Sequence, residues 1–344
     1  QKNDIHTLLI ADECHHYGSQ YNSLIFRFTK NNRFNPSMYH SIGLSATPLC
    51  KNFDTVLLPN LGKIIYTYSF QEAKQDGIIA DYFLISCGIR LNGNEVSEYG
   101  KLSEEINKLY AYVMKNYPEL SDRNGEDFFN ELSLYAAEEP ESPPAKLFFL
   151  IRKRRSLIYN AQSRYQCLYS LLEELQTKDK QEKIIIFTQH IEQTEEIYRS
   201  LQQNFKYRIS HYHSAMDSRQ RKMNLTDFKT GESKILVACK ALDEGLDIPD
   251  AGIGIVFSTS STSRQHIQRL GRIIRKSQDK PSAVLYYLYA DHTVESSYFI
   301  DAEENHTVFL NYSSDDDLFY CDKYANVLRK IYEQYAKTMD RTQY

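Results

Sequence analysis

Residues 8–15 read Leu-Leu-Ile-Ala-Asp-Glu-Cys-His, an apolar run that ends in two adjacent carboxylates, Asp12 and Glu13. A buried parallel strand has this pattern when it delivers acidic side chains to the carboxyl edge of a sheet. One carboxylate there can hold the Mg²⁺ of a nucleotide, and its neighbour can orient an attacking water. The alternative is a strand end with two solvated acids, and this stretch alone leaves both interpretations open.

Three further stretches follow in the chain. They are Gly43-Leu44-Ser45-Ala46-Thr47-Pro48, Glu244-Gly245-Leu246-Asp247-Ile248-Pro249 and Gln268-Arg269-Leu270-Gly271-Arg272-Ile273-Ile274-Arg275. In this order the four stretches resemble the Walker B box, the coupling motif and the fifth and sixth motifs of superfamily 2 helicases and translocases of the DExH type. The resemblance implies an α/β fold with two RecA-like parallel-sheet lobes, which bind ATP and Mg²⁺ and hydrolyse ATP at their interface.

The resemblance also divides the chain, because the first lobe would be partial and the second nearly complete. Between them, acidic helical stretches alternate with prolines, which predicts a helical insertion. The expected parts are residues 1–87 of the first lobe, an insertion over 88–145, the second lobe over 146–290 and an accessory segment over 291–344.

Several elements follow from local pattern. Residues 64–68 and 82–86 predict strands of the first lobe, separated by a short helix with Ser69 as its cap. Residues 146–175 predict one long helix or a broken pair. From residue 183 onward, apolar runs alternate with helical stretches, which predicts a parallel sheet closed by a strand over 282–288.

The resemblance assigns roles in the first lobe residue by residue. Asp12 corresponds to the acid that helps to hold Mg²⁺, and Glu13 to the acid that positions the attacking water. His15 corresponds to a residue that couples the nucleotide site to the second lobe. Ser45 and Thr47 correspond to residues that link hydrolysis to lobe movement, and their alternative is a helix cap or a turn.

In the second lobe, Arg272 and Arg275 lie three positions apart and therefore on one face of a predicted helix. The resemblance implies that their guanidinium groups stabilise charge on the γ-phosphate, which requires the two lobes to close. Asp247 corresponds to an acid that reaches the nucleotide ribose or the arginines, and Gln268 to a residue that contacts the nucleotide or the first lobe. Gly245 marks a tight turn beside them.

Nucleic acid is implied to run across the tops of both lobes, held by its backbone and not by its base sequence. The candidate contact residues are Thr188, Gln189, His190, His213 and Lys240. DNA is preferred over RNA, because the Asp-Glu-Cys-His box, the insertion and the segment over 72–79 resemble bacterial motors of restriction and defence systems. Other subunits of such a complex are expected partners. The basic run over 152–155 is either a solvated face or a phosphate contact.

Bulk properties restrict the classes further. The net charge of −4 requires any nucleic-acid site to be a local basic patch. The six cysteines include no Cys-x-x-Cys pair, so neither a zinc site nor a disulfide framework is predicted, and reduced thiols fit a cytoplasmic protein. No apolar run reaches about 18 residues, so no membrane span is expected.

The printed sequence contains no Gly-x-x-x-x-Gly-Lys-Ser/Thr phosphate loop. In the family this loop precedes the Asp-Glu box, so we expect it upstream in a longer chain or in a partner, and expect this chain alone not to hydrolyse ATP. The alternatives are a non-hydrolysing scaffold subunit that binds nucleic acid, a split motor half, or an RNA helicase. A scaffold has no need of Asp12, Glu13, Arg272 and Arg275, which favours the motor.

Overall fold

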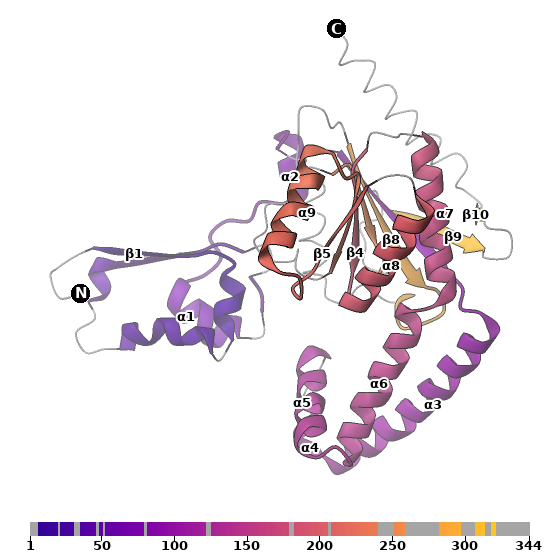
Figure 1. Ribbon diagram of the computed structural model, residues 1–344. Coiled ribbons are helices and arrows are strands. Elements are labelled where there is room, and N and C mark those ends of the chain that lie inside the picture. The colour runs from indigo at the N-terminus through magenta and orange to yellow at the C-terminus, as the bar shows by residue number, and fades with distance from the viewer. Residues whose placement is uncertain are drawn as a thin grey trace, which may run out of the picture. The chain divides into compact units, whose positions relative to one another are not determined.

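The computed structural model divides the chain into two compact units (Figure 1). The first comprises residues 1–79 with 262–272, and the second comprises residues 80–261 with 273–344. The structure describes residues 6–19, 21–30, 35–45, 48–50, 52–78, 81–121, 125–178, 182–205, 208–239, 251–258, 282–296, 307–313 and 318–320. Within these ranges, no helix is long and apolar enough to cross a membrane.

The first unit is built on two parallel strands, β1 (Thr7–Ala11) and β2 (Tyr39–Gly43), with Ala11 opposite Gly43. Short helices surround them: η1 (Cys14–Gly18), η2 (Asn22–Lys30), η3 (Pro36–Met38), η4 (Phe53–Leu57), α1 (Leu58–Leu61) and α2 (Phe70–Gln75). The strand predicted to be buried is only partly so. Leu8 and Ile10 are 61% and 60% exposed, whereas Ala11 at the end of the strand is buried.

The segment after α1 contains one wrong prediction and one confirmed one. Residues 64–68 form no strand and pair with none of the described strands, and Ile65 and Tyr66 are 81% and 72% exposed. The predicted cap is present at α2. The Ser69 backbone N–H donates to Glu72 Oε2 over 2.7 Å, and the Glu72 backbone N–H donates to Ser69 Oγ over 3.2 Å.

The second unit contains an eight-stranded sheet in the order β10-β9-β3-β8-β7-β4-β6-β5, parallel except for β10. Its strands are β3 (Asp81–Ile89), β4 (Ile184–Thr188), β5 (Ile209–Tyr212), β6 (Ile235–Cys239), β7 (Ile253–Val256), β8 (Ser282–Ala290), β9 (Thr307–Ser313) and β10 (Leu318–Tyr320). Helices α7 (Gln162–Lys178), α8 (Ile191–Asn204) and α9 (Ser218–Thr230) pack against it. The central strands are continuous apolar runs because both faces of the sheet are covered.

The position of β3 differs from the expectation. We expected residues 82–86 to leave the first lobe and residue 87 to end it, but β3 lies between β8 and β9 and is parallel to both. Ile85, Cys87 and Ile89 are fully buried in the core of this second unit. A strand in the interior needs hydrogen-bond partners on both edges, and β8 and β9 supply them. Consequently β8 does not close the sheet, and the expected accessory segment contributes β9 and β10.

The insertion is helical, as predicted, and has a core of its own. It comprises α3 (Gly93–Asn116), α4 (Pro118–Ser121), α5 (Gly125–Glu138) and α6 (Pro143–Tyr159). Its buried residues are Ile106, Val113, Leu120, Leu132, Leu147 and Phe148. Because α6 packs on both α3 and α5, the insertion extends to residue 159 and not to 145. We call these four helices the helical arm. The predicted 146–175 helix is thus a broken pair, α6 and α7.

The basic run over 152–155 is solvated only in part: Arg152 and Lys153 are exposed, whereas Arg154 and Arg155 are half-buried. A phosphate contact of this run stays a prediction. Arg154 donates to Ser103 Oγ over 3.2 Å and lies over the ring of Tyr99. Arg155 lies over Phe129, with 4.6 Å between the guanidinium carbon and the ring centroid. These cation–π contacts and hydrogen bonds hold α6 to its neighbours in the helical arm.

A buried arginine joins the helical arm to the sheet. Arg164, at the start of α7, is fully buried and donates hydrogen bonds to the carbonyls of Ile158, Phe257 and Leu288. Its guanidinium also pairs with the buried carboxylate of Glu295. One planar group thereby fixes the end of α6, the strand ends of β7 and β8, and the turn after β8.

Candidate functional site

The two carboxylates of the first unit lie at the carboxyl end of β1. Asp12 is exposed and its Oδ1 accepts a hydrogen bond from the Glu13 backbone N–H over 2.9 Å. Glu13 has φ 45° and ψ 50°, the left-handed region that residues other than glycine seldom adopt. Backbone strain of this kind is concentrated at functional sites. The turn leads directly from the strand into η1 and leaves both acidic side chains accessible.

His15 connects this pair to the second motif. Its side chain is 1% exposed, and its Nδ1 lies 2.8 Å from Ser45 Oγ and 3.4 Å from Glu13 Oε2. The backbone continues the strand pairing, since Leu44 N–H donates to the Ala11 carbonyl and Cys14 N–H to the Leu44 carbonyl, each over 2.9 Å. The structure therefore brings Asp12, Glu13, His15 and Ser45 together.

Gly43, which sequence reasoning did not select as a site residue, allows the two motifs to lie close together, with Cys14 against it. A Cβ atom on Gly43 would lie 3.0 Å from Cys14 Sγ and 3.1 Å from Leu61 Cδ1, so a larger side chain there would force the motifs apart. Burial, and then the neighbouring Cys50, raise the pKa of the Cys14 thiol. The signal in the sequence was a glycine at the end of a strand directly before the Leu-Ser-Ala-Thr stretch.

The arrangement fits a nucleotide-bound magnesium ion on this side. Mg²⁺ is usually held through one or two carboxylates and several waters. Asp12 is exposed, and the Glu13 side chain is 47% exposed, although its Oε2 is buried beside His15. Asp12 could therefore hold the ion while Glu13 retains an oxygen for water.

In the second unit, polar side chains join the carboxyl ends of β4 and β7. Gln189 N–H donates to Ser258 Oγ over 2.9 Å, and Ser258 Oγ donates to Gln193 Oε1 over 2.7 Å. Thr188 Oγ1 lies 2.6 Å from Thr194 Oγ1. Thr188 and Ser258 are fully buried, and Gln189 is 7% exposed. These side chains hold α8 on the sheet, so Thr188 and Gln189 do not present a surface to nucleic acid as predicted.

The two predicted histidines differ. His190, which precedes α8, is exposed. His213 is 6% exposed, and its Nε2 lies 2.8 Å from Glu195 Oε1, so the predicted contact to nucleic acid is not available to this ring. Burial would raise the pKa of Glu195, but the hydrogen bond from His213 and the nearby His211 outweigh it and hold that pKa below its ordinary value. Burial lowers the pKa of His211.

Seven predicted residues lie outside the described residues, and their roles stay predictions. They are Thr47, Lys240, Gly245, Asp247, Gln268, Arg272 and Arg275.

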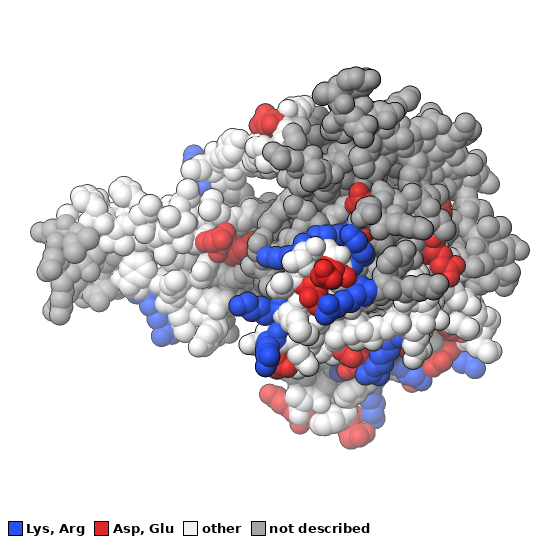
Figure 2. Space-filling view, turned by 45° about the horizontal axis from the view of Figure 1, so that its top comes forward, with Lys and Arg blue, Asp and Glu red and all other residues white. Residues whose placement is uncertain are grey.

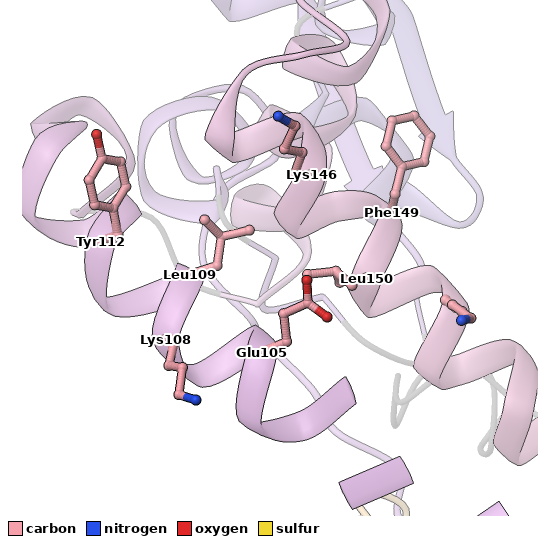
Figure 3. A pocket seen from close by; sticks show the side chains of 8 residues that line it. Glu105, Lys108, Leu109, Tyr112, Lys146, Phe149 and Leu150 are labelled. Carbon is pink, nitrogen blue, oxygen red and sulfur yellow. The ribbon is translucent and has the colours of Figure 1, made fainter. Parts of the chain in front are cut away.

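A pocket of about 610 Å³ lies between α3 and α6 in the helical arm (Figure 3). Figure 3 shows Leu109 and Leu150 on facing helices, with the rings of Tyr112 and Phe149 further out. The lining comprises Glu105, Lys108, Leu109, Tyr112, Lys146, Phe149, Leu150 and Lys153. This lining contains one carboxylate and no imidazole or thiol, and none of its residues is a predicted site residue.

The chain is similar in sequence to known helicases and translocases. Residues 163–277 match the helicase conserved C-terminal domain. A protein of Sulfurisphaera tokodaii named "DNA 3'-5' translocase XPB2" is 31% identical over 279 residues, 81% of this chain and 57% of that protein. "Probable ATP-dependent RNA helicase ddx49" of Dictyostelium discoideum is 34% identical over 121 residues, 35% of this chain and 23% of that protein. The chain thus spans less than two thirds of each relative.

Among solved structures, "S. cerevisiae Dbp5 bound to RNA and ADP BeF3" superposes with a TM-score of 0.53 at 13% identity. The superposition covers 95% of this chain and 63% of that chain, and at this identity it shows the fold alone. The matched domain, the relatives and the parallel sheet together support a superfamily 2 helicase C-terminal lobe with a RecA-like fold in this chain.

Proposed function

We propose that this chain is part of an ATP-dependent nucleic-acid motor of the DExH type, with DNA as its track. The observation that carries the proposal is the contact of His15 with Ser45 beside the two accessible carboxylates Asp12 and Glu13. The DNA preference is supported by the extent of alignment. The relative named as a DNA translocase aligns over 81% of the chain, whereas the RNA helicases align over 30–38%.

In this proposal each residue has one task. Asp12 holds Mg²⁺, which when bound neutralises phosphate charge. Glu13 accepts a hydrogen bond from the attacking water and orients it. His15 lies within reach of both Glu13 and Ser45, so a change at the carboxylate is passed to the stretch that follows β2. Arg272 and Arg275 would stabilise transition-state charge from the second lobe.

A local basic surface in the second unit supports nucleic-acid binding despite the net charge of −4. Figure 2 shows lysine and arginine side chains gathered around a few carboxylates on the face turned to the viewer, in the region where Figure 1 places α9. The first half of α9 carries Arg219, Arg221 and Lys222, of which Arg219 and Lys222 are exposed. Phosphate contacts from such a helix would be independent of base sequence and weakened by salt.

The test uses the full-length protein and measures ATP turnover with no nucleic acid, with DNA and with RNA of matched length. We expect DNA to stimulate turnover and Glu13→Gln to reduce the stimulated rate by at least about 100-fold, because a neutral amide cannot take a proton from the attacking water. Glu104→Gln, an exposed carboxylate of the helical arm, is the matched control. Normal turnover in Glu13→Gln would contradict the proposal that this chain is part of an ATP-dependent motor. Stimulation by RNA alone would show that the track is RNA and not DNA.

The second candidate is a subunit that binds nucleic acid without hydrolysis, and it predicts DNA binding with no nucleotide turnover in the full-length protein. The two accessible carboxylates favour the motor. Association with other subunits of a restriction or defence complex remains part of the proposal, and co-purification of the full-length protein from its native host would test it.

A further inference from the structure

Glu195, His211 and His213 form a cluster in which two imidazoles face one carboxylate oxygen. Nε2 of His213 and Nε2 of His211 lie 2.8 Å and 3.2 Å from Glu195 Oε1. One donor atom from each of the three residues lies within 4.8 Å of the others. The side chains are 7%, 16% and 26% exposed for His213, His211 and Glu195, so the cluster is largely shielded yet open on the carboxylate side.

Two elements of the second unit present these groups. His211 lies in β5 and His213 follows it directly, and residues two apart in an extended chain point to the same side. Glu195 lies in α8, which packs on β5. The ring of Tyr198, one helical turn further along α8, stacks on His211 with 3.8 Å between centroids. The imidazole of His211 is thereby held in its orientation.

We propose that Glu195, His211 and His213 bind a transition-metal ion, with Zn²⁺ the best-matched cation. Two imidazoles and one carboxylate are a ligand set that zinc accepts, with bonds of about 2.0–2.2 Å and a fourth position for water. Tetrahedral bonds of this length place neighbouring ligand atoms about 3.3 Å apart. The observed separations of 2.8 Å and 3.2 Å are close to this value, so small side-chain movements would admit the ion.

The surroundings set the strength of binding. Within the part of the chain that the structure describes, neither Nδ1 atom of the two histidines has a hydrogen-bond partner. Metal-binding histidines usually donate their other ring N–H, and loss of such a partner lowers affinity about 10- to 100-fold. The site is therefore exchangeable and weaker than a structural zinc site. An ion there ties α8 to β5, the edge strand of the sheet.

The experiment uses the untagged chain, freed of metal by a chelator and dialysed against Zn²⁺ in the presence of excess Mg²⁺. Mg²⁺ prefers an all-oxygen shell and saturates any carboxylate site without occupying this one. Bound zinc is counted per chain, and Co²⁺ replaces it for a visible spectrum that reports tetrahedral nitrogen and oxygen ligation. The variants are Glu195→Gln, whose amide oxygen still accepts a ring N–H, and His211→Gln. The control is His292→Gln, which changes an exposed histidine 3.5 Å from Asp291 in the same unit.

We expect one Zn²⁺ per wild-type chain and a rise in melting temperature on zinc addition, because the ion binds the folded state. Both cluster variants should weaken zinc binding at least about 10-fold, and His292→Gln should bind as wild type does. Circular dichroism shows whether each variant is folded. If one of the two cluster variants is unfolded, zinc binding by the other one tests the proposal. Absence of zinc uptake by the wild type, or equal uptake by all variants, would overturn the site and leave a cluster held by hydrogen bonds alone.

Discussion

Nδ1 of His15 lies 2.8 Å from Oγ of Ser45, 30 residues further along the chain. The contact extends the parallel pairing of β1 and β2 by side chains at the point where both strands have ended. It places the group nearest to the Glu13 carboxylate in direct contact with the stretch after β2. A movement of the Glu13 carboxylate or of the stretch after β2 is therefore expected to change the position of the other.

The first prediction concerns this contact. His15→Ala and Ser45→Ala should each destabilise the first unit by roughly 1–2 kcal/mol, because each removes one partner of a hydrogen bond in a partly buried region. The loss of stability in the double variant should be about 1 kcal/mol smaller than the sum of the losses in the two single variants, because both substitutions remove the same interaction. Thermal and urea unfolding of the four chains measures this cycle, with the exposed Ser37→Ala as control. Strict additivity would show that the contact is not formed in solution.

The second prediction concerns Gly43. Gly43→Ala should destabilise the first unit by about 1–3 kcal/mol, because the new Cβ would lie 3.0 Å from Cys14 Sγ and 3.1 Å from Leu61 Cδ1. Gly100→Ala is the matched control. A Cβ at Gly100 meets nothing within 4 Å, and the position lies inside α3, so alanine should stabilise that helix by about 0.5–1 kcal/mol. Opposite shifts in melting temperature are expected, and shifts of the same sign would contradict the packing argument.

The third prediction concerns Arg164. Arg164→Met should destabilise the second unit by about 3–5 kcal/mol, because Glu295 and three carbonyls lose their donor in the interior. Glu98→Gln removes an exposed partner 3.2 Å from Lys153 and should change stability by less than about 1 kcal/mol. The chain has no tryptophan, so urea unfolding is followed by circular dichroism. If both variants lose a similar free energy of unfolding, burial of the Arg164–Glu295 pair does not determine its contribution to stability.

The fourth prediction concerns pH. The backbone N–H and then the hydroxyl of Ser69 lower the pKa of Glu72 below its ordinary value of 4.5. Because the folded-state pKa is the lower one, this stabilisation of α2 is present above pH 4.5 and is lost as the pH falls through the folded-state value. A carboxyl-resolved NMR titration should show the pKa of Glu72 rising in Ser69→Ala and preserved in Ser69→Thr. The rise should be partial, because alanine keeps the backbone N–H, and an unchanged pKa in Ser69→Ala would show that the hydroxyl contributes nothing.

Local pattern predicted much of the second unit. The run at residues 184–188 became a fully buried strand, and Gly231 ends α9 in the left-handed conformation that favours glycine there. The place of β3 was not predictable in the same way. A continuous apolar run suits any parallel sheet, and which sheet receives it is decided by partners distant in sequence, here β8 and β9.

In the candidate site, too, local features were predictable and contacts between distant residues were not. Adjacent carboxylates after an apolar run predicted the position of Asp12 and Glu13, because strand and turn are local. The cluster of Glu195 with two histidines was missed. The His-x-His spacing is visible in the sequence, but the third group comes from α8, and its approach depends on how that helix is rotated against the sheet. Burial of Thr188 was also missed, because a hydroxyl after a strand suits a surface and a helix contact equally.

The pairing of β3 with β8 also sets the order in which the chain can be assembled during synthesis. Partners such as Ser86 and Tyr287 are about 200 residues apart, whereas β1 and β2 pair within a few tens of residues. At a translation rate of about 5–20 residues per second, β3 waits roughly 10–40 s for its neighbour to emerge from the ribosome. During this interval the helical arm, whose contacts are local, can already form. The unpaired edge of β3 is meanwhile open to association with other nascent chains, which makes it the segment that a chaperone would need to protect.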